Sequence, residues 1–500
     1  MRHYQLFIDG EFTDAASGQT FESRNPSDGN VIATVAKGGR EDVARAITAA
    51  RRAFDEGPWP SMTPAERSAI LLRLAAILQE RQGELSELEA EDAGHTLRLA
   101  NLFTVPLAVN HLQFLAEEAG RLEYTESIAQ RAPFPAPAWN FVQREPYGVC
   151  AGIIPWNFPL IMAVWKAAPA LATGNTMVLK PSPYTPATAT EFVAAAGEAG
   201  VPKGVLNVVH GTGPIAGEAL VTDARVDKVA FTGSTAVGKR IMQLASETLK
   251  KVTLELGGKG PTILLDDADL DIAVPGALWA TYLHGGQMCE SGTRCFVPAG
   301  LYDEVVARLV ESSEGLTVGS AMDFASDIGP LVDHRQVDTV KRYVQIGQDE
   351  GAKLLTGGDV PTGVPQGGYY FAPTIFGGVE NSMRIAQEEI FGPVLSVIRY
   401  ESVEEAIRLA NDTIYGLAGS VWSRDIPRAL EVAKRIKNGT VWINDHHLLS
   451  AAAPHGGYKQ SGLGRELGRW GLEEYLQVKH IHVDQTPTKD QKFWYQVIGL

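Results

Sequence analysis

The chain has 500 residues, 45% of them hydrophobic and 21% charged, so its composition is that of a globular protein with room for two or three domains. Its net charge of -15 argues against nonspecific binding to nucleic acid, which needs a basic surface. No run of about 18 apolar residues is present, so we expect no membrane span.

The number of cysteines and the first residues of the chain indicate the cellular compartment. The chain contains three cysteines, and the start from Met1 to Leu6 has no signal-peptide core. We therefore expect a cytoplasmic protein without a disulfide framework. No His/Cys cluster has the spacing of a metal site, and we predict none.

The first 145 residues predict short strands followed by helices. A strand at 5–8 runs into Asp9-Gly10, which is a hairpin signal. Helices are expected over 41–54, from an N-cap at Thr63, and over about 102–120. The segment 131–146 begins with a proline-rich run that excludes a helix or a central strand, so we expect an excursion that leaves the first domain and returns.

From residue 148 strands and helices alternate regularly. We expect strands at 148–154, 176–179, 206–209, 226–231 and 252–256, separated by helices at 160–171, 186–199, 215–221 and 235–246. This alternation implies right-handed crossovers and a parallel sheet, which binds ligands at the carboxyl ends of its strands. A second alternating set over 262–445 predicts another α/β unit, and the tail from Tyr475 alternates like an edge strand.

Cys289 is the residue around which the candidate chemistry is organised. It lies in the loop Gly285-Gly286-Gln287-Met288-Cys289-Glu290-Ser291-Gly292, after a helix-like segment at 269–284. The glycines let the backbone approach a ligand closely, so the thiol is a candidate nucleophile. A buried cysteine that only packs is the alternative interpretation.

Four further features lie at strand ends, and each has a plainer structural alternative. The run 231–238 joins a strand to a helix whose free N–H groups suit a phosphate, although glycine at such a turn is often structural. Lys180 could hold a ribose or phosphate, or be a solvated lysine. Glu255 lies in an apolar run, where burial would raise its pKa and suit a general base, or it pairs with a buried cation. Asn157 could donate to an oxyanion, or cap the next helix.

Together these residues suit the oxidation of an aldehyde through a thioester. Cys289 would attack the carbonyl, while Asn157 and the Cys289 backbone N–H would hold the oxyanion. A hydride would leave to nicotinamide, and Glu255 would activate the water that cleaves the thioester.

The sequence as a whole resembles the aldehyde dehydrogenase superfamily. The resemblance is carried by PWNFP (155–159), FTGSTAVG (231–238), LELGGK (254–259), GQMC (286–289), EEIFGP (388–393) and PHGGYKQSGLGRELG (454–468). These motifs run in the family's order and span nearly the whole chain.

The resemblance implies a role for each matching position. Cys289 is then the nucleophile, Glu255 the general base and Asn157 the oxyanion donor, with Lys166 and Glu466 relaying protons from the base. NAD, or NADP in its place, would be held by Ile154, Trp156, Lys180, Ser182, Gly213, Gly233, Ser234, Gly238, Gly257, Glu389 and Phe391. The walls of a substrate tunnel would be Phe158, Met162, Trp165 and Leu449.

The resemblance also implies an α/β fold with a Rossmann-like cofactor domain, an α/β catalytic domain and a small β oligomerisation arm. The boundaries would be 1–122 with 146–257 for the NAD(P)-binding domain, 258–456 for the catalytic domain, 123–145 with 470–485 for the arm, and 486–500 for a C-terminal extension. Because the arm bridges subunits, we expect a homodimer or a homotetramer.

Three departures from the family pattern bear on specificity and assembly. Pro183 replaces a glutamate that NAD-preferring members often carry, which suggests that NADP is tolerated. Leu449 stands where many members place an aromatic residue, and His455 replaces a frequent phenylalanine, as in some aminoaldehyde-oxidising relatives. The extension contains Phe493-Trp494-Tyr495, and we expect it to dock on a neighbouring subunit or over a tunnel mouth.

The sequence favours broad oxidation of aliphatic or aromatic aldehydes, because the matched tunnel residues are apolar or aromatic. An aminoaldehyde, betaine-aldehyde or semialdehyde dehydrogenase is the alternative, since the histidines at 446, 447 and 455 could serve a polar group or only the oligomer. A CoA-acylating enzyme usually lacks the base at Glu255, and a non-catalytic use of the scaffold would not need Cys289, Glu255 and Asn157 together.

Overall fold

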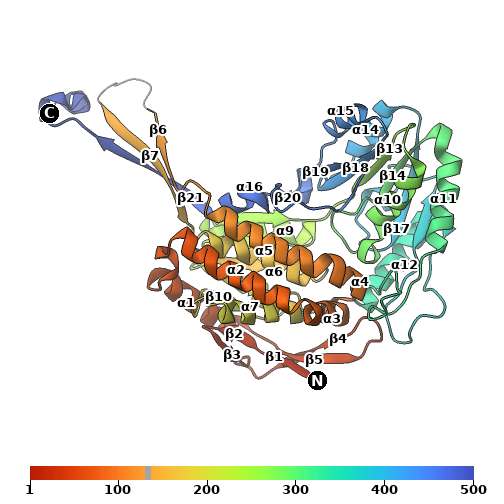
Figure 1. Ribbon diagram of the computed structural model, residues 1–500, viewed down its shortest axis with the longest axis horizontal. Helices are drawn as coiled ribbons and strands as arrows, with labels where there is room; N and C mark the ends of the chain where they lie inside the picture. Colours follow the sequence, from red (N-terminus) through yellow and green to blue (C-terminus); the bar gives the residue numbers. More distant parts are fainter. Residues whose placement is uncertain (130–136, 500) are drawn as a thin grey trace.

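The computed structural model describes residues 1–129 and 137–499, which form two large sheets, two small sheets and the helices that cover them (Figure 1). The first large sheet has the order β20-β12-β11-β8-β9-β10-β2-β3, with its central strands β8 to β12 parallel. Its strands are β2 (Leu6–Ile8), β3 (Glu11–Thr13), β8 (Val149–Ile153), β9 (Thr176–Lys180), β10 (Leu206–Val208), β11 (Lys228–Thr232), β12 (Lys251–Glu255) and β20 (Gly462–Leu463). The parallel sheet predicted from residue 148 onward is confirmed.

Helices cover both faces of this sheet, because successive strand residues point to opposite sides and both sides are apolar. One face packs against α2 (Pro64–Glu80), α3 (Gln82–Ala93), α5 (Val105–Ala119), α6 (Pro159–Ala172) and α7 (Ala187–Glu198). The other face packs against α1 (Arg40–Asp55), α8 (Glu218–Thr222) and α9 (Thr235–Ala245). The predicted N-cap of α2 is confirmed: Thr63 Oγ1 accepts from the Glu66 N–H at 3.2 Å, and Glu66 accepts from the Thr63 N–H at 2.7 Å.

Two predicted helices differ in detail from the observed ones. The helix expected at 215–221 begins earlier, as a π-helical turn over Gly213–Gly217 that continues into α8. The helix expected at 102–120 is preceded by α4 (Leu97–Leu99) and a π-helical segment (Ala100–Thr104). By length and composition this whole run, Leu97–Ala119, could cross a membrane, but half of its apolar window is buried and α5 packs against α2 and α6.

The second large sheet has the order β15-β16-β17-β14-β13-β18-β19 and is parallel except at β15. Its strands are β13 (Pro261–Leu264), β14 (Arg294–Pro298), β15 (Lys353–Thr356), β16 (Thr374–Gly377), β17 (Val394–Tyr400), β18 (Ala418–Trp422) and β19 (Thr440–Ile443). Its helices are α10 (Leu270–Tyr282), α11 (Tyr302–Glu314), α12 (His334–Asp349), α13 (Arg384–Gln387), α14 (Val403–Asn411) and α15 (Ile426–Ala433). The second α/β unit expected from the sequence is thus confirmed.

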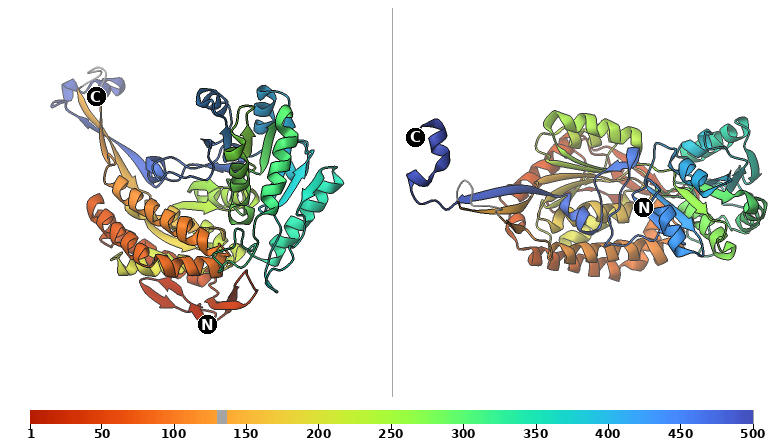
Figure 2. Two further views of the ribbon diagram at one scale, coloured as in Figure 1. Left: turned by 45° about the vertical axis from the view of Figure 1, so that its right-hand side comes forward. Right: turned by 90° about the horizontal axis from the view of Figure 1, so that it is seen from above.

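A three-stranded antiparallel arm projects from the body and carries the C-terminus near its tip (Figures 1 and 2). Its strands are β6 (Thr125–Ile128), β7 (Ala138–Pro146) and β21 (Leu476–Asp484), and β21 pairs with β7 along its whole length. The edge strand predicted after Tyr475 is therefore confirmed, whereas the proline-rich residues 131–136 lie outside the described residues. The other small sheet joins β1 (Arg2–Tyr4), β5 (Val31–Ala36) and β4 (Thr20–Arg24), and the short helix α16 (Gly468–Glu473) precedes the arm.

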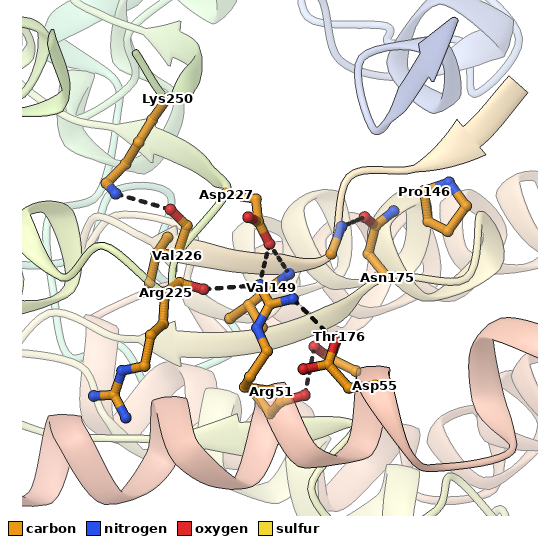
Figure 3. A network of polar contacts seen from close by, with 12 residues as sticks. Arg51, Asp55, Pro146, Val149, Asn175, Thr176, Arg225, Val226, Asp227 and Lys250 are labelled. Atoms are coloured by element: carbon orange, nitrogen blue, oxygen red, sulfur yellow. Dashed lines mark hydrogen bonds and ion pairs between the residues drawn. The ribbon is translucent and has the colours of Figure 1, made fainter. Parts of the chain in front are cut away.

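Polar contacts tie together the amino-terminal ends of the central strands (Figure 3). Asp227, just before β11, accepts a hydrogen bond from the Val149 N–H at 2.7 Å and pairs with Arg51 of α1. Asn175 accepts from the Gly148 N–H at 2.9 Å, and a Cβ at Gly148 would collide with Asp227. These contacts fix the amino-terminal ends of the strands. At their carboxyl ends, on the opposite side, the strands therefore present side chains to a ligand in a set geometry.

Candidate active site

The Cys289 loop begins with a sharp reversal of the chain after α10. His284, Gly285 and Gly286 all adopt left-handed backbone conformations, with φ of 52°, 63° and 73°. A Cβ at Gly286 would collide with the carbonyl of Gly392, so the close approach there requires glycine. The Gln287 side chain then pins the loop, because it donates to the His284 carbonyl at 3.0 Å and accepts from the Val332 N–H at 2.9 Å.

Asn157 reaches this loop from the first sheet. It stands in the turn between β8 and α6, and its side-chain amide donates to the Gln287 carbonyl at 2.9 Å. An amide nitrogen carries two hydrogens, so one donor remains for a ligand. Asn157 does not cap α6, whose first turn begins with Pro159 and has no side-chain cap from Phe158.

One cavity of about 250 Å³ lies where the Cys289 loop faces the strand ends. Of the predicted site residues it collects Trp156, Asn157, Phe158, Met162, Trp165, Gly233, Ser234, Gly257, Cys289, Glu389, Phe391 and Leu449. Residues from distant parts of the sequence therefore share one space, with a thiol and an amide donor in its wall. A larger apolar cavity of about 580 Å³ adjoins it and shares Phe103.

Glu255 lies at the end of β12 behind this cavity. Its side chain is buried and neither of its carboxyl oxygens has a hydrogen-bond partner among the described residues. Burial, followed by the negative charge of Glu466, raises the pKa of Glu255 well above its usual range. Lys166 and Glu466 form a buried ion pair nearby, and the Lys166 charge acts in the opposite direction by favouring the Glu255 carboxylate.

The surroundings of the Cys289 thiol favour its neutral form. Burial raises the pKa of Cys289 well above its usual range, and the carboxyl groups of Glu290, Glu389 and Glu255 add to this effect. Because a thiolate is the reactive form, the proton of Cys289 needs an acceptor when the sulfur forms a bond. Glu255 is a carboxyl group whose raised pKa suits that exchange.

Three polar side chains beside the nucleophile form a buried row that sequence reasoning did not assemble. Glu290 Oε1 lies 3.1 Å from His447 Nδ1, and Glu290 Oε2 lies 3.8 Å from His455 Nδ1. His455 Nε2 lies in turn 3.8 Å from Glu255 Oε2. Glu290 and His455 line the cavity, and burial raises the pKa of Glu290 to about 7. Glu290 could have been predicted as a site residue only because it follows Cys289 directly in the sequence.

The histidine-rich loop is buried within the chain itself. His446 donates from Nε2 to the Glu290 carbonyl at 2.8 Å, and His447 donates from Nε2 to the Ala280 carbonyl at 3.1 Å. In both cases the partner is a carbonyl, which only accepts, so Nε2 carries the hydrogen. Both histidines thus anchor the nucleophile loop and α10 to the loop after β19.

The predicted cofactor residues divide into two groups. Glu389 and Phe391 line the cavity, where Glu389 accepts from the Gly258 N–H at 3.0 Å and the Phe391 ring lies edge-on to Trp156. Lys180 lies apart, with its ammonium donating to the carbonyls of Pro181 at 2.7 Å and Gly211 at 3.0 Å. Burial lowers the pKa of Lys180 to about 8. This second group also contains Ile154, Ser182, Gly213 and Gly238, which do not line the cavity.

The two glycines of that second group differ in their surroundings. A Cβ at Gly213 would meet open space, whereas a Cβ at Gly238 would collide with Leu256. Gly238 therefore lets α9 pack closely on the chain after β12, and its role toward a cofactor stays a prediction. Ser234 caps α9 by accepting from the Val237 N–H at 3.4 Å, so the helix N-terminus opens beside Gly233.

Comparisons with known proteins show which family the chain belongs to. Residues 12–481 match the model of the aldehyde dehydrogenase family. The chain is 48% identical over 483 residues to a betaine aldehyde dehydrogenase of Bacillus subtilis, covering 96% of this chain and 98% of that protein. It is 45% identical over 480 residues to a putative aldehyde dehydrogenase, DhaS, of the same organism, covering 96% and 95%.

Solved structures give the same result for the fold. The NAD+ complex of a Staphylococcus aureus betaine aldehyde dehydrogenase has a TM-score of 0.94 at 41% identity, covering 97% of this chain and 95% of that one. The NAD+ complex of a Bacillus cereus aldehyde dehydrogenase has a TM-score of 0.94 at 43% identity, covering 97% of each chain. With the motifs, the fold and these matches in agreement, the chain belongs to the aldehyde dehydrogenase family.

Proposed function

We propose that this enzyme oxidises an aldehyde to the carboxylic acid with NAD+, with Cys289 as nucleophile, Asn157 as oxyanion donor and Glu255 as general base. The observation that carries the proposal is the shared cavity, in which Cys289 and Asn157 face Glu389 and Phe391 while Glu255 lies buried behind them. A thiol, a free amide donor and a base with open lone pairs are the groups that acyl transfer through sulfur requires.

The Cys289 sulfur bonds to the aldehyde carbon as the thiol proton passes to Glu255, and the carbonyl oxygen gains the charge that the free hydrogen of Asn157 Nδ2 stabilises. Loss of hydride from that carbon leaves a thioester on Cys289. Once that first proton has left Glu255, the carboxylate takes a proton from water, whose oxygen bonds to the acyl carbon as the carbon–sulfur bond breaks. The acid is released, and the proton on Glu255 returns to the Cys289 sulfur and restores the thiol.

The residues present fit NAD+, which accepts the hydride when bound. Lys180 uses two of its three hydrogens on backbone carbonyls, so one donor remains for a ribose hydroxyl. The N-terminus of α9 beside Gly233 and Ser234 offers unpaired N–H groups to phosphate, and Glu389 lies in the cavity wall for the second ribose. Lys166 and Glu466, paired beside Glu255, would carry its proton away.

The first experiment compares wild type with Cys289→Ala, using NAD+ and NADP+ reduction with short and long aliphatic, aromatic and amino aldehydes. Cys295→Ala is the matched control, because that thiol is buried in β14 away from the cavity. We expect Cys289→Ala to lose at least about four orders of magnitude in kcat, while the control keeps its activity. Absence of reduction by the wild type with every aldehyde would overturn the proposal.

A second candidate is a substrate with a cationic group near the aldehyde, such as betaine aldehyde or an aminoaldehyde. Glu290 Oε2 has no hydrogen-bond partner among the described residues, although it is buried, and the aromatic side chains of Trp165 and Phe158 also line the cavity. A carboxyl oxygen together with aromatic faces suits a quaternary or primary amine. When ionised, the same carboxyl group would repel the carboxylate of a semialdehyde.

Betaine aldehyde and 3,3-dimethylbutanal separate this candidate from broad aldehyde oxidation, because they differ in nitrogen versus carbon at one position. If Glu290 binds the cationic group, the kcat/KM of wild type should be about tenfold or more higher for betaine aldehyde than for 3,3-dimethylbutanal. Glu290→Gln should then remove most of that difference. A wild type with equal kcat/KM for both compounds would favour broad specificity.

Assembly and location complete the proposal. We propose a homodimer or homotetramer in the cytoplasm, joined through the arm. Its support is the exposed apolar side chains of the arm strands, namely Ile128, Trp139 and Val478, which a neighbouring subunit would cover.

The three free cysteines fit a reducing compartment. The domain boundaries expected from the sequence remain part of this proposal. The membership of strands in the sheets supports them, except that β20, in the unassigned residues 457–469, joins the first large sheet.

A further inference from the structure

Two buried histidines, His95 and His284, lie directly behind the turn that carries Asn157. His95 follows α3, and its Nε2 lies 2.6 Å from the backbone oxygen of Asn157. A carbonyl only accepts, so His95 Nε2 carries the hydrogen and Nδ1 is the acceptor, which receives the Thr104 hydroxyl at 3.3 Å. Burial lowers the pKa of His95 to about 4, which agrees with a neutral ring.

His284 belongs to the opposite side of the site, at the start of the Cys289 loop. Its ring lies edge-on to that of His95, with 4.2 Å between centroids, and Phe158 packs against both rings. Its Nε2 accepts from the Gln287 side chain at 3.4 Å. His284 also holds a left-handed conformation with φ of 52°, which is uncommon for a residue with a side chain and needs surrounding contacts to persist.

These contacts form a closed circuit. His95 holds the Asn157 carbonyl and packs against His284, His284 contacts the Gln287 side chain, and the Gln287 carbonyl accepts from the Asn157 amide at 2.9 Å. Asn157 is therefore held both at its backbone carbonyl, by His95, and at its side-chain amide, by the Gln287 carbonyl. His284 contacts both His95 and the Gln287 side chain, and so connects the two. Behind His95, Glu89 Oε2 lies 3.1 Å from Nδ1 without hydrogen-bond geometry, while Glu89 Oε1 is held by Thr188 at 2.6 Å.

We propose that His95 and His284 are positioning residues that hold the free hydrogen of the Asn157 amide in register with the Cys289 loop. The inference rests on the proposed role of Asn157 as oxyanion donor. Rigid donors stabilise an oxyanion because they are already oriented when charge develops, and a displacement of about 1 Å can cost about a hundredfold in rate. Neither histidine lines the cavity of Cys289, although His284 lines the adjoining larger cavity, so toward Cys289 both act through Asn157 and Gln287.

The experiment is a double-mutant cycle between His95→Leu and Asn157→Ala, read as kcat, KM and the affinity for NAD+. We expect His95→Leu to lower kcat by about tenfold or more, with both KM values and the NAD+ affinity changed by less than about threefold. In the Asn157→Ala background the same change should cost less than about twofold, because the group it positions is gone. His95→Gln, whose amide can still donate to the Asn157 carbonyl, should recover most of kcat.

Two further variants separate positioning from a loss of stability. Phe192→Leu opens a cavity in the buried face of α7 away from the site, so it should lower the unfolding temperature and leave kcat unchanged. If His95→Leu does not fold, His284→Asn takes its place in the cycle, because asparagine tolerates the left-handed conformation and removes the ring. Additive losses in kcat, or a kcat of the single variant within twofold of wild type, would overturn the inference. Inactivity of the wild type with all aldehydes would instead overturn the proposed function.

Discussion

Glu255 and His455 face each other in a buried space, with 3.8 Å between Glu255 Oε2 and His455 Nε2. Neither oxygen of Glu255 has a hydrogen-bond partner among the described residues, so both can accept from a water molecule or a thiol. Burial lowers the pKa of His455, so the histidine does not supply a fixed positive charge that would hold Glu255 ionised. Glu255 is thus a carboxyl group with open lone pairs and a raised pKa, as a base near neutral pH requires.

Glu255→Gln should separate the two halves of the reaction. Without a base for water, we expect steady-state kcat to fall by about a hundredfold or more, because the thioester on Cys289 is no longer hydrolysed efficiently. Rapid-mixing measurements of NADH should reveal a burst of up to one equivalent per active site, which forms more slowly than in wild type because Glu255 also takes the Cys289 proton, followed by much slower turnover. A first turnover slowed as much as the steady state would indicate that Glu255 acts mainly in the attack by sulfur.

Glu466→Gln should move the acidic limb of the pH–kcat profile to lower pH. The base works in its deprotonated form, and the charge of Glu466 raises the pKa of Glu255, so activity falls as pH drops through that raised value. Removing the charge lowers the pKa of Glu255 and leaves the Lys166 cation free to lower it further. We expect this limb to move to lower pH in a profile measured between pH 5 and 9. A limb that stays in place would contradict this coupling.

Pro183→Glu should convert a tolerant enzyme into one that selects NAD+. We expect wild type to use NADP+ with at least about a hundredth of the kcat/KM for NAD+, because no carboxylate at 183 repels the 2′-phosphate. The glutamate should lower kcat/KM for NADP+ by about tenfold or more and leave that for NAD+ within about twofold. Pro183→Gln, of similar size without the charge, is the control.

Deletion of residues 486–500 should weaken assembly. In this extension Trp494 is 58% exposed, Val497 71% and Ile498 74%, and the segment lies at the tip of the arm (Figure 2). Apolar side chains gathered on a projecting element are expected to be covered by a second copy of the chain. Light scattering across a dilution series should reveal dissociation of the truncated enzyme at higher concentration than wild type. Unchanged assembly and unchanged kinetics together would contradict a role for the extension.

Local patterns in the sequence predicted much of the fold. The alternation from residue 148 onward has a spacing set by backbone geometry, so β8 to β12 were found within two residues of their observed bounds. The N-cap at Thr63 and the edge strand after Tyr475 rest on neighbours in the chain and could be predicted for the same reason. The residues themselves indicated Cys289 and Asn157, and the family motifs added Glu389; the structure gathers all three in one cavity.

The sequence by itself determined the α/β alternation, the motifs and the identity of the candidate nucleophile, amide donor and base. Only the tertiary structure decided that Glu290 faces His447 and His455, and that His95 holds Asn157 from behind. These pairs are separated by 62 to 165 residues along the chain, and no periodicity or spacing encodes a contact over such distances. Their geometry arises when the two sheets and the loops between them pack together, because that packing buries the polar groups and leaves each of them with few partners.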